Sequence, residues 1–148
     1  MKTLRQVIEK LNPEQDDDSG YYYASADYKD AFYDCKILVW EEVGSYQGDY
    51  FVLVEGPDRN YGFTVIGYGS CSGCDALCGS SYGSNRSTVI NGICDLFKGI
   101  RDGVHWENTK KDMKKYLAKE YDKEMKDTYF SNEKERVATW KKILKALE

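Results

Sequence analysis

Hydrophobic residues recur every three to four positions in four segments of the chain, a spacing that predicts amphipathic helices. The first segment covers residues 3–11, where Thr3 and Gln6 have the spacing of a capping box. The other three segments are residues 85–102, 108–126 and 132–147. In the last of them, Asn132 and Glu135 predict a second capping box. The side chains expected to be buried there are Val137, Trp140, Leu144 and Leu147.

Between the first and second of these helices the pattern changes to that of β-strands. Runs rich in Val, Ile, Tyr and Phe cover residues 36–43, 50–55 and 61–68, with glycine-containing turns between them. This predicts a three-stranded antiparallel meander packed against helices, and therefore the α+β class. Residues 14–20 are expected to be an exposed connector and residues 69–84 a cysteine-containing loop.

Length and composition limit the class of protein. The 148 residues fit a single domain, residues 1–148, and 41% hydrophobic residues are enough to form a core. The longest aliphatic run, residues 37–40, is far shorter than the roughly 20 residues needed to cross a bilayer. The first residues lack the apolar stretch of a secretory signal. We therefore expect a cytoplasmic protein that does not associate with membranes.

Negative charge is concentrated near the start of the chain. The formal net charge is −4, and residues 1–60 carry 13 acidic but only 6 basic side chains. Since affinity for nucleic acid comes largely from neutralising phosphates, we expect no direct binding to nucleic acid. Lysines in the last two predicted helices alternate with acids, which is typical of a solvated face.

The same acidic region is rich in tyrosine, a residue enriched in protein interfaces. Clustered carboxylates also attract basic surfaces. The candidate partner-binding residues are Asp16, Asp17, Asp18, Tyr21, Tyr22, Tyr23, Asp27 and Asp30. The alternative is that the tyrosines are half-buried against the sheet and the acids only keep the protein in solution.

Three of the five cysteines follow the third predicted strand closely. Cys71 and Cys74 form a Cys-x-x-Cys motif, and Cys78 comes four residues later. Thiolates at this spacing suit a tetrahedral zinc ion with a structural role. Cys94 is the expected fourth ligand, and the alternatives are His105, Asp75 and water. The sequence thus predicts a zinc knuckle formed by Cys71, Cys74, Cys78 and Cys94.

Other interpretations of these cysteines remain open. In a reducing compartment an odd number of cysteines favours thiols or metal ligands over disulfides. They are then either ligands or ordinary thiols in a glycine- and serine-rich loop. A Cys-x-x-Cys between a strand and a helix also occurs in thiol–disulfide oxidoreductases, although no βαβ unit precedes it here. An iron–sulfur cluster needs a close fourth cysteine, which is missing. His105 follows the pattern of a packed residue rather than that of a catalytic one.

Residues 67–77 read Gly-Tyr-Gly-Ser-Cys-Ser-Gly-Cys-Asp-Ala-Leu, and with the preceding strands this segment resembles small proteins encoded by bacteriophages and prophages. The similarity covers residues 49–78. The whole chain is also similar to zinc-containing anti-CRISPR proteins that inhibit type II-A Cas9. That resemblance implies a non-enzymatic inhibitor that binds a Cas9-type effector and blocks DNA loading or cleavage. A thiol–disulfide oxidoreductase using Cys71 and Cys74, or a phage accessory protein with another partner, are the alternatives.

Overall fold

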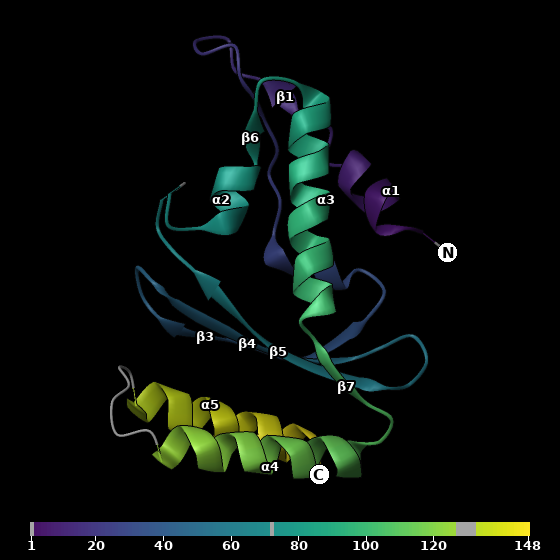
Figure 1. The fold of residues 1–148 in the computed structure, drawn as a ribbon, viewed down its shortest axis with the longest axis vertical. Coiled ribbons are helices and arrows are strands. Elements are labelled where there is room, and N and C mark those ends of the chain that lie inside the picture. Colours follow the sequence, from purple (N-terminus) through teal and green to yellow (C-terminus); the bar gives the residue numbers. More distant parts are fainter. Residues whose placement is uncertain (1, 72, 127–132) are drawn as a thin grey trace. The chain divides into compact units, whose positions relative to one another are not determined.

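The computed structural model describes residues 2–71, 73–126 and 133–148 of the chain. The chain forms two compact units, each built from two segments (Figure 1). The first unit comprises Met1–Tyr33 and Tyr68–Gly103, and the second comprises Asp34–Gly67 and Val104–Glu148. The single-domain expectation stays a prediction, because it depends on whether the two units unfold together. In the described part of the chain, no helix is both long and apolar enough to cross a membrane.

The first unit is arranged around one long helix. Its elements are α1 (Leu4–Glu9), β1 (Glu14–Gln15), β2 (Tyr22–Tyr23), the 3-10 helix η1 (Tyr28–Phe32), α2 (Ala76–Ser80), β6 (Tyr82–Gly83) and α3 (Arg86–Asp102). Helix α3 contacts α1, α2 and η1 as well as strands β2 and β6. Asn85 caps it by accepting a hydrogen bond from the amide of Thr88. The predicted helices over residues 3–11 and 85–102 are confirmed, including the capping box of Thr3 and Gln6.

The first unit also contains a small sheet that the sequence pattern does not predict. Its strands pair antiparallel in the order β1-β2-β6. Residues 14–20 are therefore more than a connector, and residues 69–84 contain both α2 and β6. Two-residue strands are too short to show an alternating pattern. Their stability depends on partners far apart in sequence, since Tyr23 lies opposite both Glu14 and Tyr82.

The second unit contains the predicted meander. Its elements are β3 (Lys36–Gly44), β4 (Gly48–Glu55), β5 (Tyr61–Tyr68), β7 (His105–Glu107), α4 (Lys110–Lys126) and α5 (Glu133–Ala146). The sheet order is β3-β4-β5-β7, so β7 adds a fourth strand to the three that were expected. The α+β class is confirmed.

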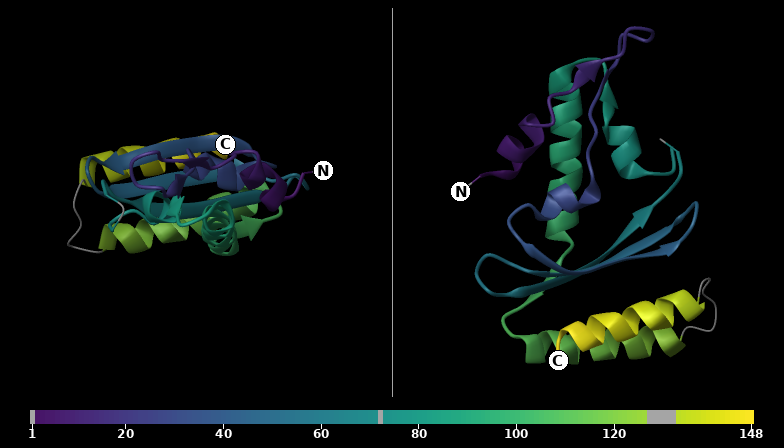
Figure 2. Two further views of the ribbon diagram at one scale, coloured as in Figure 1. Left: turned by 90° about the horizontal axis from the view of Figure 1, so that it is seen from above. Right: turned by 180° about the vertical axis from the view of Figure 1, so that it is seen from behind.

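Helices α4 and α5 lie side by side against one face of this sheet (Figure 2). The core between these two helices and the sheet contains Val43, Phe51, Leu53, Phe63, Met113, Leu117, Trp140, Ile143 and Leu147. The expected burial of Trp140, in α5, and of Leu147, directly after that helix, is confirmed. Val137 and Leu144 are only half-buried, because Ile143 takes the central position of the face. The predicted cap at Asn132 lies outside the described residues.

Candidate functional site

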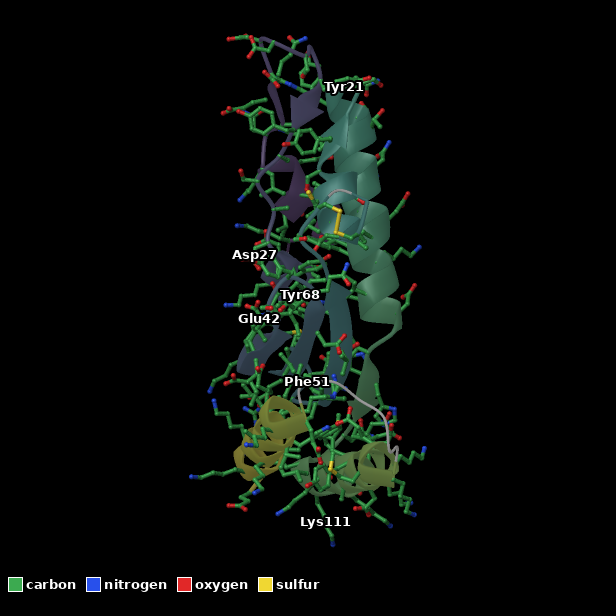
Figure 3. All side chains as sticks on the ribbon, turned by 90° about the vertical axis from the view of Figure 1, so that its left-hand side faces the viewer. Tyr21, Asp27, Glu42, Phe51, Tyr68 and Lys111 are labelled. Carbon is green, nitrogen blue, oxygen red and sulfur yellow. A yellow bond between two sulfur atoms is a disulfide. The ribbon has the colours of Figure 1, made fainter. Side chains whose placement is uncertain are left out.

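Cys71 and Cys74 lie in a tight turn that follows β5. The amides of Cys74 and Asp75 both donate to the carbonyl oxygen of Cys71, at 3.1 and 2.8 Å. The two cysteine Cα atoms are 5.2 Å apart, within the range that a disulfide spans, and a disulfide joins the sulfurs (Figure 3). The expectation that these cysteines form no disulfide is therefore wrong for this pair, because the turn brings the two sulfurs together. Zinc binding by the reduced sulfurs stays a prediction.

The carboxylate of Asp75 connects the two ends of this turn. Its Oδ2 accepts from the amide of Gly69 at 2.9 Å, and its Oδ1 accepts from the amides of Leu77 and Cys78, both at 3.0 Å. Burial alone would raise the pKa of Asp75, but these hydrogen bonds and one from Tyr28 outweigh it and lower the pKa. Asp75 is thus an ionised cap of α2 whose two oxygens already have protein partners, which disfavours it as a zinc ligand.

Two further residues fit closely around the turn. The buried hydroxyl of Tyr28 donates to Oδ1 of Asp75 at 2.8 Å and accepts from the amide of Leu77 at 3.2 Å. A Cβ atom on Gly69 would lie only 2.4 Å from the carbonyl oxygen of Cys74. Only glycine fits there without displacing the turn. Hydrogen bonds to Asp75 thus connect Gly69, before the turn, with Leu77 and Cys78 in α2, after it.

The four predicted zinc ligands are not arranged as a metal site. Among the described residues, no group of three or more His, Cys, Asp or Glu side chains is placed to hold a metal ion. Cys71 and Cys74 share a disulfide, whereas Cys78 and Cys94 are free thiols. Burial in α3 raises the pKa of Cys94, which disfavours the thiolate that zinc requires. This arrangement does not fit a tetrahedral zinc ion, and zinc binding stays a prediction.

His105, the alternative ligand, has partners within the second unit. Its Nε2 atom lies 2.9 Å from Oε1 of Glu107. Its ring stacks on Tyr116, with 3.6 Å between the ring centroids. These contacts give the histidine a packing role in β7.

The second group of candidate residues forms the hairpin between β1 and β2. Asp16 stabilises its turn, since the carboxylate accepts from the amide of Asp18 and from the hydroxyl of Ser19, both at 3.0 Å. The side chains of Asp17 and Asp18 are exposed. Tyr21 is 55% exposed and lies at this end of the first unit (Figure 3). The hairpin therefore presents carboxylates and an aromatic ring on a turn that is already ordered.

The register of the small sheet brings further side chains next to this hairpin. Glu14, Tyr23 and Tyr82 are neighbours across the three strands. The hydroxyl of Tyr23 donates to Oε2 of Glu14 at 3.1 Å, and the rings of Tyr23 and Tyr82 are 6.3 Å apart. Sequence reasoning missed Glu14 and Tyr82, because no sequence pattern gives the pairing of β2 with β6. We call the following residues the hairpin surface: Glu14, Asp17, Asp18, Tyr21, Tyr23 and Tyr82.

The remaining candidates have other roles. The guanidinium of Arg86, on α3, lies 5.8 Å from the ring centroid of Tyr22. Asp27 and Asp30 form a capping box at the start of η1, where their carboxylates accept backbone hydrogen bonds. Asp27 also lies well away from Tyr21 (Figure 3). The structure thus brings together five of the eight predicted residues, Asp16 to Asp18 with Tyr21 and Tyr23.

No protein-family model, curated protein or solved structure matches this chain.

Proposed function

We propose that this protein is a phage-derived, non-enzymatic inhibitor that binds a bacterial Cas9-type effector in the host cytoplasm and blocks its DNA loading or cleavage. The observation that carries the binding role is the hairpin surface. There Tyr21 and Tyr82 are 55% and 56% exposed, in the same small sheet and turn as the exposed carboxylates of Asp17 and Asp18. The identity of the partner is supported only by the resemblance of the whole chain to zinc-containing anti-CRISPR proteins, and the phage origin by the resemblance of residues 67–77.

The chemistry of this surface suits a basic partner. Nucleases that act on DNA present cationic grooves, and the carboxylates of Glu14, Asp17 and Asp18 complement that charge. The tyrosine rings add apolar contact area at a low cost in side-chain entropy. Because Asp16 already orders the turn, little further conformational entropy is lost on binding.

The direct test is co-purification with type II-A Cas9 followed by a DNA-cleavage assay. We expect the protein to be retained by Cas9 and cleavage to fall as its concentration rises. The double charge reversal Asp17→Lys and Asp18→Lys should weaken binding by about tenfold or more, because like charges then face each other. The matched control reverses Asp58 and Asp102, which are exposed acids elsewhere in the chain. Full cleavage at excess protein, or equal losses in both double variants, would reject the proposal.

The tyrosines have a separate test. Tyr21→Ala and Tyr82→Ala each remove an exposed ring from the proposed interface, so affinity for Cas9 should fall while the thermal unfolding midpoint changes little. Tyr46→Ala is the matched control, because Tyr46 is 80% exposed and lies in the turn between β3 and β4. Equal affinity of all three variants would place the interface elsewhere.

A structural zinc ion remains part of the sequence-based prediction, but the hairpin surface does not require it. Metal analysis of protein purified under reducing conditions decides this point. About one zinc per chain, with a lower unfolding temperature after chelation, would support the ion. A metal-free protein with an unchanged unfolding temperature would remove it from the proposal.

A further inference from the structure

We propose that the Cys71–Cys74 disulfide is a reversible thiol–disulfide exchange site, in which an external thiolate attacks Cys71 and Cys74 leaves as a thiolate. The substrate class is a dithiol, either a small molecule or a pair of cysteines on another protein. This inference goes beyond the inhibitor function and does not depend on it, since no residue of the hairpin surface takes part.

Exposure distinguishes the two sulfur-bearing residues. Cys71 is exposed, as are its neighbours Ser70 and Gly73, whereas Cys74 is half-buried. Thiol–disulfide exchange requires the incoming sulfur to reach one sulfur of the disulfide, so its rate depends on access. An external thiolate therefore meets Cys71 first.

The local hydrogen bonding identifies the leaving group. The amide of Cys71 donates to Sγ of Cys74 at 2.8 Å. A hydrogen bond to the charged form of a group stabilises that form, and a more stable thiolate leaves faster. Gly69 makes room for this sulfur, because a Cβ atom at that position would lie 2.9 Å from Sγ of Cys74. Access to Cys71 and stabilisation of Cys74 thus favour the same direction of attack.

The backbone of the turn does not depend on the disulfide. Two amides donate to the carbonyl oxygen of Cys71, and the carboxylate of Asp75 accepts from residues on both sides of the turn. When the disulfide is reduced, these hydrogen bonds hold the two thiols close together. Their high effective concentration then favours re-formation of the bond, which makes the exchange reversible.

The exchange balances as follows. The substrate thiolate forms a bond to Sγ of Cys71, the Cys71–Cys74 bond breaks, and its electron pair goes to Sγ of Cys74, which takes up a proton. The second substrate thiol then loses a proton and attacks the substrate sulfur of the mixed disulfide. Cys71 leaves as a thiolate and is protonated. The substrate dithiol is oxidised to a disulfide, and the Cys71–Cys74 pair is reduced by two electrons and two protons.

The first test uses reduced glutathione as the probe on oxidised, full-length wild-type protein, with acid quenching to trap the mixed disulfide. Mass spectrometry of peptides assigns each mixed disulfide to a cysteine. Glutathione should be found on Cys71 about ten times as often as on Cys74, because it attacks Cys71 and Cys74 leaves. Equal or reversed proportions would overturn the proposed direction. Oxidised wild-type protein without a Cys71–Cys74 bond would overturn the site itself.

The second test measures the role of the turn. The equilibrium between the dithiol and the disulfide in a glutathione buffer gives the effective concentration of the two thiols. Asp75→Asn and Tyr28→Phe each weaken the hydrogen bonds around the turn, so each should lower that concentration severalfold. Asp95→Asn is the control, an exposed residue of α3. If all three variants match the wild type, the turn does not hold the thiols together, and the reversibility argument is wrong.

Discussion

The hydroxyl of Tyr28 donates a hydrogen bond to Oδ1 of Asp75 at 2.8 Å, joining residues that are 47 positions apart in the sequence. It connects η1 to α2, and each of these elements has only five residues. Helices this short are not stable by themselves in water, so tertiary contacts must hold them. The conformation around the cysteine turn therefore depends on a buried pair that is distant in sequence.

Removing the hydroxyl should destabilise the protein without changing its fold. In Tyr28→Phe the carboxylate of Asp75 loses one donor, but the amide of Leu77 keeps its bond to Asp75. We expect the free energy of unfolding to fall by about 1–2 kcal/mol, measured by urea denaturation. Tyr46→Phe removes an equivalent hydroxyl from an 80% exposed residue and should change it by less than about 0.5 kcal/mol. Equal effects would show that the Tyr28 hydrogen bond contributes nothing.

Asp75 should make the free energy of unfolding depend on pH in the acidic range. Its pKa in the folded protein is lowered below the ordinary value of 3.8, so its carboxylate stabilises the fold above that value. The contribution is lost as the pH falls through the lower folded-state pKa. Between about pH 7 and about pH 3, wild-type protein should therefore lose more unfolding free energy than Asp75→Asn, which cannot titrate. Identical losses in urea titrations of the two proteins would contradict this.

The two glycines near the cysteines should respond differently to alanine. A Cβ on Gly69 would lie 2.4 Å from the carbonyl oxygen of Cys74, whereas a Cβ on Gly73 meets nothing within 4 Å. Gly69→Ala should therefore displace the turn and lower the thermal unfolding midpoint by several degrees. Gly73→Ala should leave it unchanged within about one degree, and similar shifts for both variants would argue against this turn geometry.

The long helices and strands could be predicted because each contains enough residues to show a regular spacing of hydrophobic positions. Helix α3 and strands β3 to β5 show their spacing over eight residues or more, and a meander pairs strands that follow each other. Strand β7 has three residues, and the residues of β5 that pair with it lie 42 to 46 positions earlier in the chain. A run that short has no period, so the fourth strand could not be recognised.

The candidate site was only partly predictable for a related reason. The Cys-x-x-Cys motif indicated that Cys71 and Cys74 lie close together. The two cysteines are only three positions apart, so a single turn of the backbone sets the distance between their Cα atoms. Asp75 was considered only as a ligand, because its partner Tyr28 is remote in sequence. Tyr82 became part of the hairpin surface through strand register alone. Local chemistry could be predicted from the sequence, whereas long-range pairing required the fold.

Arg136 should be the most sensitive charged residue of the second unit. Its Nη1 donates to Asp49 at 2.8 Å, its Nε donates to Glu124 at 3.0 Å, and its guanidinium lies 4.9 Å from the ring centroid of Phe51. The side chains of Arg136 and Glu124 are each only 17% exposed, so Arg136→Ala leaves a half-buried carboxylate without its cation. We expect a loss of about 2 kcal/mol in urea denaturation, reduced from the value for a fully buried pair because water reaches Asp49.

Two variants separate geometry from charge in this cluster. Arg136→Lys keeps the positive charge but cannot donate to Asp49 and Glu124 in the same planar arrangement, so its stability should lie between those of Arg136→Ala and the wild type. Lys142→Ala removes a cation that is 61% exposed and pairs with Glu41, and it should cost less than about 0.5 kcal/mol. If Lys142→Ala is as destabilising as Arg136→Ala, burial does not determine the strength of these ion pairs. If Arg136→Lys equals the wild type, a single positive charge is sufficient and the planar guanidinium geometry is not required.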